Sequence, residues 1–590
     1  MNKNNQDVKL NENTINSPSD FQQLGSVSSI IDTLSYQSDP LAVYHTLCSE
    51  AHNEGSSSLK NNTLLLESAE IDKKHQLKSL LLVDTAVKIV CNANKVTFSA
   101  LTNNGRNALA FAKQALATCA DITAQSNEQN NEQYSEHDNS TLTAFTATFP
   151  DVNQQSDERS RLLASNPFQS LRVFQQLNNL SGHPFSVFLG GALAFDMMAV
   201  SEKLPEVEES DNTCPDFVFY LAETLIVIDH EKQSSELIVN LFSGANHEDN
   251  KAALSARIDS IKTTLARNIT ATLTPKAASV AASLPKAVKT DISDTEFCQI
   301  VNNLKENILA GDIFQVVPSR TFSLPCSNTL NAYKALKHSN PSPYMFYLQD
   351  NDFCIFGASP ESSLKYIESN RHVEIYPIAG TRPRGFNNKG SLSPDLDSRL
   401  ELDLRLDKKE LAEHIMLVDL ARNDIARVSQ PGTRHVADLL KVDRYSHVMH
   451  LVSRVCGTLE HELDALHAYQ ACMNMGTLSG APKVKATSLI RQVEGKRRGS
   501  YGGAVGYITG DGDMDTCIVI RSAFVRDQVA HIQAGAGVVF DSDPQSEANE
   551  TRQKAQAVIS AVNAAENKEL IVSTSKSNNS QESSAQEMKS

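Results

Sequence analysis

Two copies of Glu-x-x-Glu, far apart in the chain, most constrain how this sequence can fold. The first pair is Glu410 and Glu413, and the second is Glu547 and Glu550. Both pairs lie in segments with helical apolar spacing, so the two side chains of each pair share one helix face. Such a pair is most often a solvated face. If the fold instead brings the four acids together, a cation must lie between them, and Mg²⁺ suits hard oxygen ligands of this kind.

Composition describes a soluble globular protein. The 590 residues are enough for more than one core or for one large composite domain, and 40% of them are hydrophobic and 21% charged. The net charge is -16, and no basic run is present. Nucleic acid and anionic membranes are therefore not expected as partners, and an anionic small substrate needs locally placed donors.

The sequence carries no visible export or membrane signal. Its start has neither a basic region followed by an apolar core nor a cleavage site, and no apolar run reaches the roughly 20 residues that a transmembrane helix needs. The ten cysteines are scattered singly, without C-x-x-C. They are typical of reduced, mostly buried residues, so we expect a cytoplasmic protein.

Three polar stretches are predicted to lie outside the ordered core. Residues 1–28 and 564–590 are poor in aromatic residues, and we expect both to be disordered tails. Residues 124–141 form a polar insertion between ordered elements, which we also expect to be disordered.

The ordered part divides near residue 290. Residues 79–101 and 216–242 are predicted to be β-hairpins, and 243–265 has helical spacing. A Pro-, Ala- and Lys-rich linker over about 271–290 then separates the N-terminal domain, 29–290, from a second domain, 291–563. Helices and short strands are mixed in the second domain without strict βαβα alternation, which favours an α+β fold.

Ten motifs follow one another in this second domain. They are AGDIFQVVPSR (310–320), NPSPYMFYL (340–348), FGASPESSLKY (356–366), IYPIAGTRPRG (375–385), KELAEHIMLVDLARND (409–424), VDRYSHVMHLVSRV (442–455), MGTLSGAPKVKA (475–486), GSYGGAVGYI (499–508), DTCIVIRSA (515–523) and QAGAGVV (533–539). In order and wording they resemble the chorismate-utilising enzymes, most closely the large subunits (component I) of anthranilate synthases. The resemblance also covers LLLESAEIDKKHQLKSLLLVD (64–84). It implies an α+β fold of two sheets flanked by helices, with an N-terminal regulatory segment packed on the catalytic core.

The resemblance gives the four acids a role. In the family Mg²⁺ holds the ring carboxylate of chorismate, and the matching positions are Glu413 and Glu550 as direct ligands. Glu410 and Glu547 match outer-shell partners that act through water. The metal then serves as a template and Lewis acid near the leaving hydroxyl.

Other matching positions bind the second carboxylate of chorismate. Arg521 offers a bidentate fork, Tyr501 a phenol, and Gly535, Ala536 and Gly537 bring backbone N–H groups close. Without the resemblance, Gly-Ala-Gly is more typical of a tight turn beside a strand.

Proton transfer involves a further set of matching positions. Glu361 matches the general acid that assists departure of the C4 hydroxyl, which requires a pKa near the working pH. His450 matches a histidine linked to aromatisation, although a lone histidine among apolar residues is more often structural. Gly380, Thr381 and Thr477 match further positions that contact the substrate.

Two positions distinguish among the reactions of the family. Isochorismate and salicylate synthases carry a lysine that activates water where Gln315 stands, and a neutral amide cannot act as that base. Ammonia, which needs no deprotonation, is thus the expected nucleophile. Aminodeoxychorismate synthases use a nucleophilic lysine where this chain has Ala379. The alternatives are that enzyme and a catalytically inert, tryptophan-sensing scaffold subunit.

The expected reaction needs a partner. The chain has no G-x-C-x-G nucleophile elbow with a downstream His-x-Glu, so ammonia must come from a separate glutaminase small subunit. We expect a heterotetramer of two large and two small subunits.

The resemblance also implies feedback inhibition by L-tryptophan. The LLLES segment supplies Ser68, and NPSPYMF supplies Pro343, Tyr344 and Met345. An apolar groove with a few polar groups suits an indole amino acid. From the residues alone, a buried strand end and a proline-rich turn are the simpler interpretation.

Overall fold

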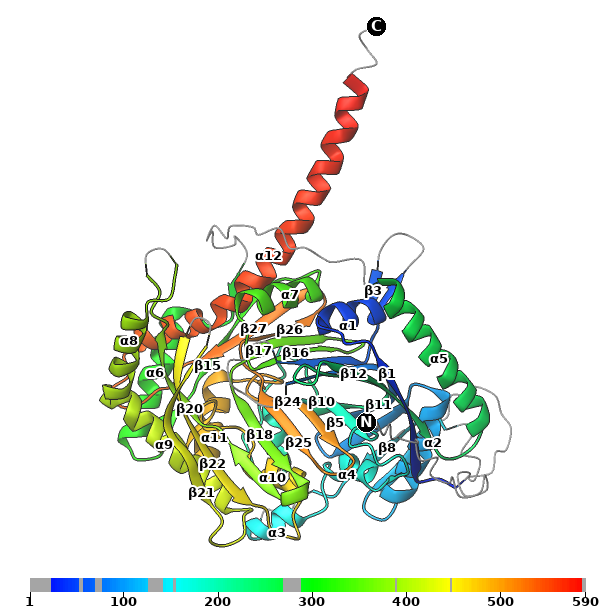
Figure 1. Ribbon diagram of the computed structural model, residues 1–590. Coiled ribbons are helices and arrows are strands. Elements are labelled where there is room, and N and C mark those ends of the chain that lie inside the picture. Colours follow the sequence, from blue (N-terminus) through cyan, green and yellow to red (C-terminus); the bar gives the residue numbers. More distant parts are fainter. Residues whose placement is uncertain are drawn as a thin grey trace, which may run out of the picture.

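The structure is a computed structural model that describes residues 23–51, 57–68, 77–125, 142–151, 155–268, 288–387, 390–445 and 448–585. Most of the predicted insertion (126–141) and of the predicted linker (271–287) lies outside the described residues. Figure 1 shows a central system of strands with helices around it. The α+β class is confirmed.

The strands before residue 290 and shortly after it are β1 (Ser26–Leu34), β2 (Ser49–Ala51), β3 (Ser57–Leu59), β4 (Thr63–Glu67), β5 (Lys78–Asn92), β6 (Lys95–Ala100), β7 (Asp121–Gln125), β8 (Ala144–Thr148), β9 (Asn178–Asn179), β10 (Phe188–Leu193), β11 (Phe217–Asp229), β12 (Ser234–Phe242) and β13 (Lys289–Thr290). The later strands are β14 (Gln315–Val316), β15 (Ser319–Pro325), β16 (Tyr344–Gln349), β17 (Cys354–Ser359), β18 (Ser362–Ile367), β19 (His372–Ile375), β20 (Ile378–Pro383), β21 (His435–Arg444), β22 (Val448–Thr458), β23 (Gly480–Ala481), β24 (Ala504–Thr509), β25 (Met514–Ile518), β26 (Ser522–Arg526) and β27 (Val529–Gly535).

The helices are α1 (Pro40–Cys48), α2 (Asn103–Leu116), α3 (Glu158–Leu163), α4 (Gln169–Gln175), α5 (His247–Asn268), α6 (Asp294–Leu309), α7 (Thr329–Ser339), α8 (Pro394–Leu406), α9 (Lys408–Ala426), α10 (Ala465–Cys472), α11 (Lys483–Glu494) and α12 (Pro544–Ala585), with short 3₁₀ helices η3 (Phe195–Val200) and η4 (Glu368–Asn370). The two predicted hairpins are confirmed as β5–β6 and β11–β12, and the helical segment after them is α5.

The strands of the two predicted domains hydrogen-bond to each other. β10 pairs with β24 and β4 pairs with β16, both antiparallel, and the ladder continues until it closes on itself. Hydrophobic clusters also contain residues from both sides of position 290, as Leu81, Met345 and Ile532 do in one of them. The two halves therefore share one hydrogen-bonded sheet system and a common core.

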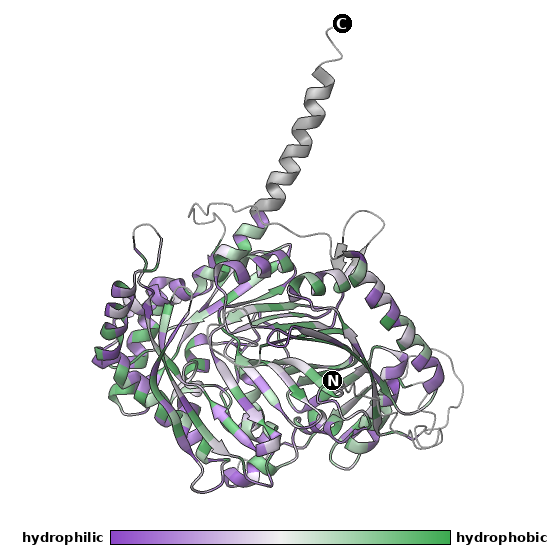
Figure 2. Ribbon diagram, viewed as in Figure 1, coloured by the Kyte–Doolittle hydropathy of each residue, from purple (hydrophilic) through white to green (hydrophobic). Residues whose placement is uncertain are grey.

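The burial of a strand depends on its place in the sheet. β11 is buried along nearly its whole length because it lies between β5, β10 and β12, whereas β21 alternates between exposed and half-buried residues. Figure 2 shows hydrophobic residues along the central strands and frequent hydrophilic residues on α5 and α8. The helices thus cover the sheet with one apolar face each.

Both Glu-x-x-Glu pairs lie in helices, as predicted, and the structure places each pair near the start of its helix. The Asp407 side chain accepts hydrogen bonds from the N–H groups of Lys409 and Glu410 and so caps α9. At α12, Pro544 opens the helix and the Asp543 carboxylate accepts from Ser546 N–H at 2.9 Å. Each helix therefore starts immediately before its pair, and Glu410 and Glu547 lie in the first turn, where the helix dipole favours negative charge.

The predicted boundaries of the tails and the insertion need correction. β1 begins at Ser26 rather than after residue 28, and β7 extends through residue 125. α12 extends to Ala585, and disorder of residues 564–590 stays a prediction. In the described part of the chain, every helix is too short or too polar to cross a lipid bilayer.

Candidate active site

The structure brings fourteen of the fifteen residues predicted to bind metal and substrate to one cavity. Its volume is about 580 Å³, and it lies where α9, α12, β20, β22 and the end of β27 meet. The predicted residues that line it are Gln315, Glu361, Gly380, Thr381, Glu410, Glu413, His450, Thr477, Tyr501, Arg521, Gly535, Gly537, Glu547 and Glu550.

The four acids face one another across this cavity. Burial raises the pKa of Glu413, and the charges of Glu410 and Glu550 raise it further, which places carboxylates from α9 and α12 within electrostatic reach of each other. Burial likewise raises the pKa of Glu547, with a contribution from Glu550. A divalent cation between the two helices would relieve this repulsion, so the donor set fits Mg²⁺.

Three basic residues that the sequence interpretation missed compensate part of this negative charge. Lys554 lies 2.7 Å from Glu550 and donates to the carbonyl of Gly535 at 3.1 Å, and Lys409 also lines the cavity. Arg382 lies 3.0 Å from Glu410. The signal for Lys554 is its position four residues after Glu550 on one helix face.

Glu361 has the environment of a general acid. Its carboxyl is buried between β17 and β18, and this desolvation raises its pKa to about 7. Thr477 donates a hydrogen bond to it at 3.0 Å, which favours the ionised form but does not offset the burial. The group therefore exchanges a proton near neutral pH, as a catalytic acid must.

His450 is held as a neutral imidazole. It lies on β22 opposite Thr381 of β20, and its Nδ1 is 2.9 Å from Thr381 Oγ1 and 3.4 Å from the Gly380 carbonyl. Burial lowers its pKa to about 4, and the nearby charge of Arg521 adds to the effect. A proton on Nδ1 suits the Gly380 carbonyl, which only accepts, and this tautomer leaves the lone pair on Nε2.

Gln315 connects Glu413 to the turn after β27. Its amide donates to Glu413 at 3.1 Å, and its buried carbonyl oxygen has no hydrogen-bond partner among the described residues. A Cβ on Gly537 would lie 2.9 Å from the Gln315 amide nitrogen and 3.4 Å from a Glu413 oxygen. Glycine at 537 therefore leaves room for the amide to reach Glu413.

Arg521, Tyr501 and Gly535 also line the cavity. Arg521 adopts a left-handed backbone conformation, with φ 49°, which is uncommon for a residue with a side chain and typical of functional sites. Burial raises the pKa of Tyr501 to about 12, so it stays a neutral phenol. The backbone N–H of Ala536 is bound to the Pro318 carbonyl at 3.1 Å, and Ala536 does not line the cavity. This N–H is thus engaged just beyond the β15–β27 ladder, whose last pair is Ser319 and Gly535, and its contact with substrate stays a prediction.

The four residues predicted to bind tryptophan come together outside this cavity. β4 and β16 are antiparallel with Glu67 opposite Met345, so Ser68 at the end of β4 lies beside the start of β16, where Pro343 and Tyr344 are found. Residues 69–76, which follow Ser68, lie outside the described part of the chain.

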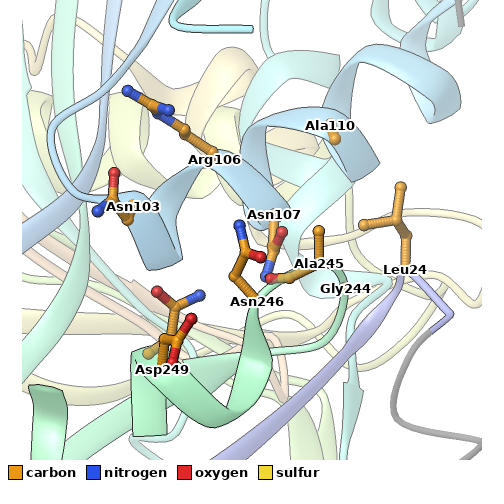
Figure 3. A pocket seen from close by; sticks show the side chains of 10 residues that line it. Leu24, Asn103, Arg106, Asn107, Ala110, Gly244, Ala245, Asn246 and Asp249 are labelled. Carbon is orange, nitrogen blue, oxygen red and sulfur yellow. The ribbon is translucent and has the colours of Figure 1, made fainter. Parts of the chain in front are cut away.

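A second cavity, of about 450 Å³, is separate from the first. It lies between the beginnings of α2 and α5 and is lined by neutral amides such as Asn103 and Asn107, together with Arg106 and Asp249 (Figure 3). None of the residues predicted to carry chemistry lines it.

Comparison with known proteins agrees with this geometry. The sequence profile of the chorismate binding enzymes matches residues 119–560. The chain is 53% identical over 558 residues to anthranilate synthase component 1 of Vibrio parahaemolyticus, covering 94% of this chain and 97% of that protein. It is 52% identical over 529 residues to anthranilate synthase component 1 of Escherichia coli, covering 89% and 95%.

Solved structures show the same fold. The crystal structure of anthranilate synthase component I from Streptococcus pneumoniae matches with a TM-score of 0.59 at 28% identity, covering 83% of this chain and 93% of that one. The menaquinone-specific isochorismate synthase of Escherichia coli matches with a TM-score of 0.59 at 16% identity, covering 92% and 96%, which shows the fold alone. By sequence along almost its whole length and by fold, this chain belongs to the anthranilate synthase component 1 family of chorismate-binding enzymes.

Proposed function

We propose that this protein is an anthranilate synthase large subunit that aminates chorismate with ammonia and then eliminates pyruvate, the first step committed to L-tryptophan. The observation that carries the proposal is the cavity in which four carboxylates face Arg521, Tyr501 and the acid Glu361. Chorismate is a dianion with one hydroxyl that must leave. The residues that line the cavity offer a partner for each of its two carboxylates and for this hydroxyl.

Mg²⁺ is the proposed cofactor. Glu413 and Glu550 would hold it directly, and Glu410 and Glu547 through water. When bound, the ion supplies a Lewis-acid contact that fixes the ring carboxylate of the substrate. The raised pKa of Glu413 supports this assignment, because buried acids that repel one another are stabilised by a cation.

The residues of the chain carry the proton and binding steps. Arg521 and Tyr501 orient the enolpyruvyl carboxylate, and Glu361, protonated below a pKa of about 7, donates to the departing C4 hydroxyl as ammonia adds at C2. The neutral His450 is assigned to the later loss of the C2 proton, which with loss of pyruvate gives the aromatic product.

Ammonia is the proposed nucleophile, and a glutaminase small subunit is its proposed source. Gln315 faces the cavity with a buried amide, which cannot act as the base that water would require. We propose a heterotetramer of two large and two small subunits in the cytoplasm. Ammonium salts should replace the small subunit when the pH is high enough to supply free ammonia.

L-Tryptophan is the proposed inhibitor. The proximity of Ser68 to Pro343, Tyr344 and Met345 supports a common site at the β4–β16 ladder. Inhibition requires that tryptophan prefer a state that binds chorismate poorly, a coupling of about 1–3 kcal/mol. Ser68→Phe should remove inhibition while leaving the uninhibited rate unchanged.

The direct test uses the purified full chain with chorismate, Mg²⁺ and ammonium at alkaline pH. Anthranilate fluorescence should rise with time and should stop when EDTA removes the metal. Product mass distinguishes the alternative, since an aminodeoxychorismate synthase retains the enolpyruvyl group. An intact, folded chain that forms no product would leave the scaffold alternative standing and overturn the proposal.

A further inference from the structure

Three side chains of metal-binding type meet outside the candidate active site, on the ladder between β19 and β22. They are His372, Glu374 and Cys456, and one ligand atom from each lies within 4.8 Å of the others. His372 Nε2 is 3.1 Å from a Glu374 oxygen, and the Cys456 sulfur is 4.0 Å from the same oxygen. This cluster plays no part in the proposed reaction.

Strand geometry explains why the three meet. His372 and Glu374 are two residues apart on β19, so their side chains lie on the same face of the sheet. Glu374 is directly opposite Cys456 in the antiparallel register of β19 and β22. Cross-strand neighbours of this kind have Cβ atoms about 5 Å apart, close enough for both side chains to hold one ion.

The separations match those of a tetrahedral ion. Zinc lies about 2.0–2.3 Å from nitrogen, oxygen and sulfur ligands, which places ligand atoms about 3.3–3.6 Å apart. The observed 3.1 Å and 4.0 Å lie on either side of this range, and the nitrogen of His372 and the sulfur of Cys456 lie within 4.8 Å of each other, so side-chain shifts of up to about 1 Å would bring the three atoms to one ion. Thiolate and imidazole ligands favour Zn²⁺ over Mg²⁺.

Burial and access also suit a bound ion. Cys456 is fully buried and Glu374 is 5% exposed, whereas the side chain of His372 is 30% exposed and stands at the solvent side. The Tyr376 hydroxyl donates to the other Glu374 oxygen at 2.9 Å, which orients the carboxylate as outer-shell partners of metal ligands do.

One positive group competes for the same carboxylate. Arg454 approaches Glu374 at 3.5 Å, but it makes a shorter contact, 2.9 Å, with Asp438. Its side chain is 35% exposed, so it can retain Asp438 and turn toward solvent when a cation enters. His372 and Glu374 also contact each other. A bound metal ion would replace this contact with one bond to each of the two side chains.

We propose that His372, Glu374 and Cys456 bind one Zn²⁺ or a similar borderline-soft divalent cation, with water in the fourth position. The ion would tie β19 to β22, the strand that also carries His450. The site is independent of the proposed catalytic reaction.

The test uses the metal-free full chain in excess Mg²⁺, which occupies the hard carboxylate site. Co²⁺, a spectroscopic substitute for Zn²⁺, is then titrated, and a thiolate-to-cobalt charge-transfer band should appear at one equivalent and disappear when Zn²⁺ is added. Cys456→Ser should abolish the band. His372→Ala, at the exposed position, should weaken Zn²⁺ binding by about 100-fold or more.

Matched controls separate this site from other thiols and imidazoles. Cys119→Ser changes a half-buried cysteine elsewhere, and His461→Ala an exposed histidine; both should bind Zn²⁺ as the unaltered chain does. Circular dichroism confirms that each variant is folded. Absence of the band in the unaltered chain, or its persistence in folded Cys456→Ser, would overturn the proposal, and so would unchanged Zn²⁺ affinity in His372→Ala.

Discussion

At the scale of single residues, the proposed Mg²⁺ site depends on the charges of Glu413 and Glu550. Glu413→Gln or Glu550→Gln should lower turnover by about 100-fold or more, because an amide is a poor ligand for a hard ion. Isothermal titration with Mg²⁺ and the rate of anthranilate formation measure the two effects. Asp419→Asn, an exposed change on the same helix, is the control and should leave both unchanged. Equal losses in all three variants would contradict a specific role for the pair.

Glu361 should set the upper limb of the pH profile. Burial raises its pKa to about 7, so the proton needed by the leaving hydroxyl is present below that pH and is lost above it. At a constant concentration of free ammonia, kcat/KM for chorismate should fall about tenfold per pH unit above neutrality. Glu361→Gln should lower the rate by about 10²–10⁴-fold and remove this limb. A profile that stays flat up to high pH would rule out Glu361 as the acid.

At the scale of elements, Arg382 fastens α8 and α9 to β20. It contacts Asp403 and Asp407 at 2.7 Å each and Glu410 at 3.0 Å, so it holds the first turn of α9, where the first Glu-x-x-Glu pair begins. Arg382→Ala should cost about 2 kcal/mol of unfolding free energy, since the half-buried carboxylates of Asp407 and Glu410 lose their guanidinium partner. It should also raise the Mg²⁺ concentration needed for half-maximal rate.

The neighbouring α8 offers the control for this change. Arg399 pairs with Asp395, and both side chains are 74% exposed. Arg399→Ala should therefore cost less than about 0.5 kcal/mol and leave Mg²⁺ dependence unchanged. Urea denaturation of both variants measures the two losses of unfolding free energy. Equal losses would show that Arg382 stabilises the protein no more than an exposed ion pair does.

At the scale of the whole molecule, a buried ion pair joins the two halves of the chain. Asp196 of η3 contacts Arg491 of α11 at 2.6 Å and accepts from the N–H groups of Arg498 and Gly499. Asp196→Asn should lower stability by about 3–5 kcal/mol, because it leaves a buried guanidinium unpaired. The exposed Glu209→Gln nearby should cost less than about 1 kcal/mol.

The shared sheet also predicts how many unfolding transitions the chain has. β10 pairs with β24 and β4 with β16, so the halves should unfold in one transition rather than two. Urea denaturation followed by tyrosine fluorescence and by circular dichroism should therefore give coincident curves for the unaltered chain and for Asp196→Asn. Two separate transitions would contradict the coupling.

Local patterns in the sequence by themselves determined the main helices and hairpins of this protein. The spacing around Glu410 and Glu547 predicted two helices, and the alternation in 79–101 and 216–242 predicted two hairpins, because periodicity and capping act over a few residues. The motif set likewise predicted fourteen of the residues that line the cavity, but not Lys409 or Lys554.

Tertiary structure alone decided the rest. The closing of the ladder across residue 290 depends on pairings between strands far apart in sequence, which no local pattern records. The same holds for the hydrogen bond of the Ala536 N–H, the contact between Arg382 and Glu410, and the pairing of Glu374 with Cys456. The raised pKa of Glu361 and the lowered pKa of His450 also arise from burial, and burial is a property of the packed molecule, not of the residue.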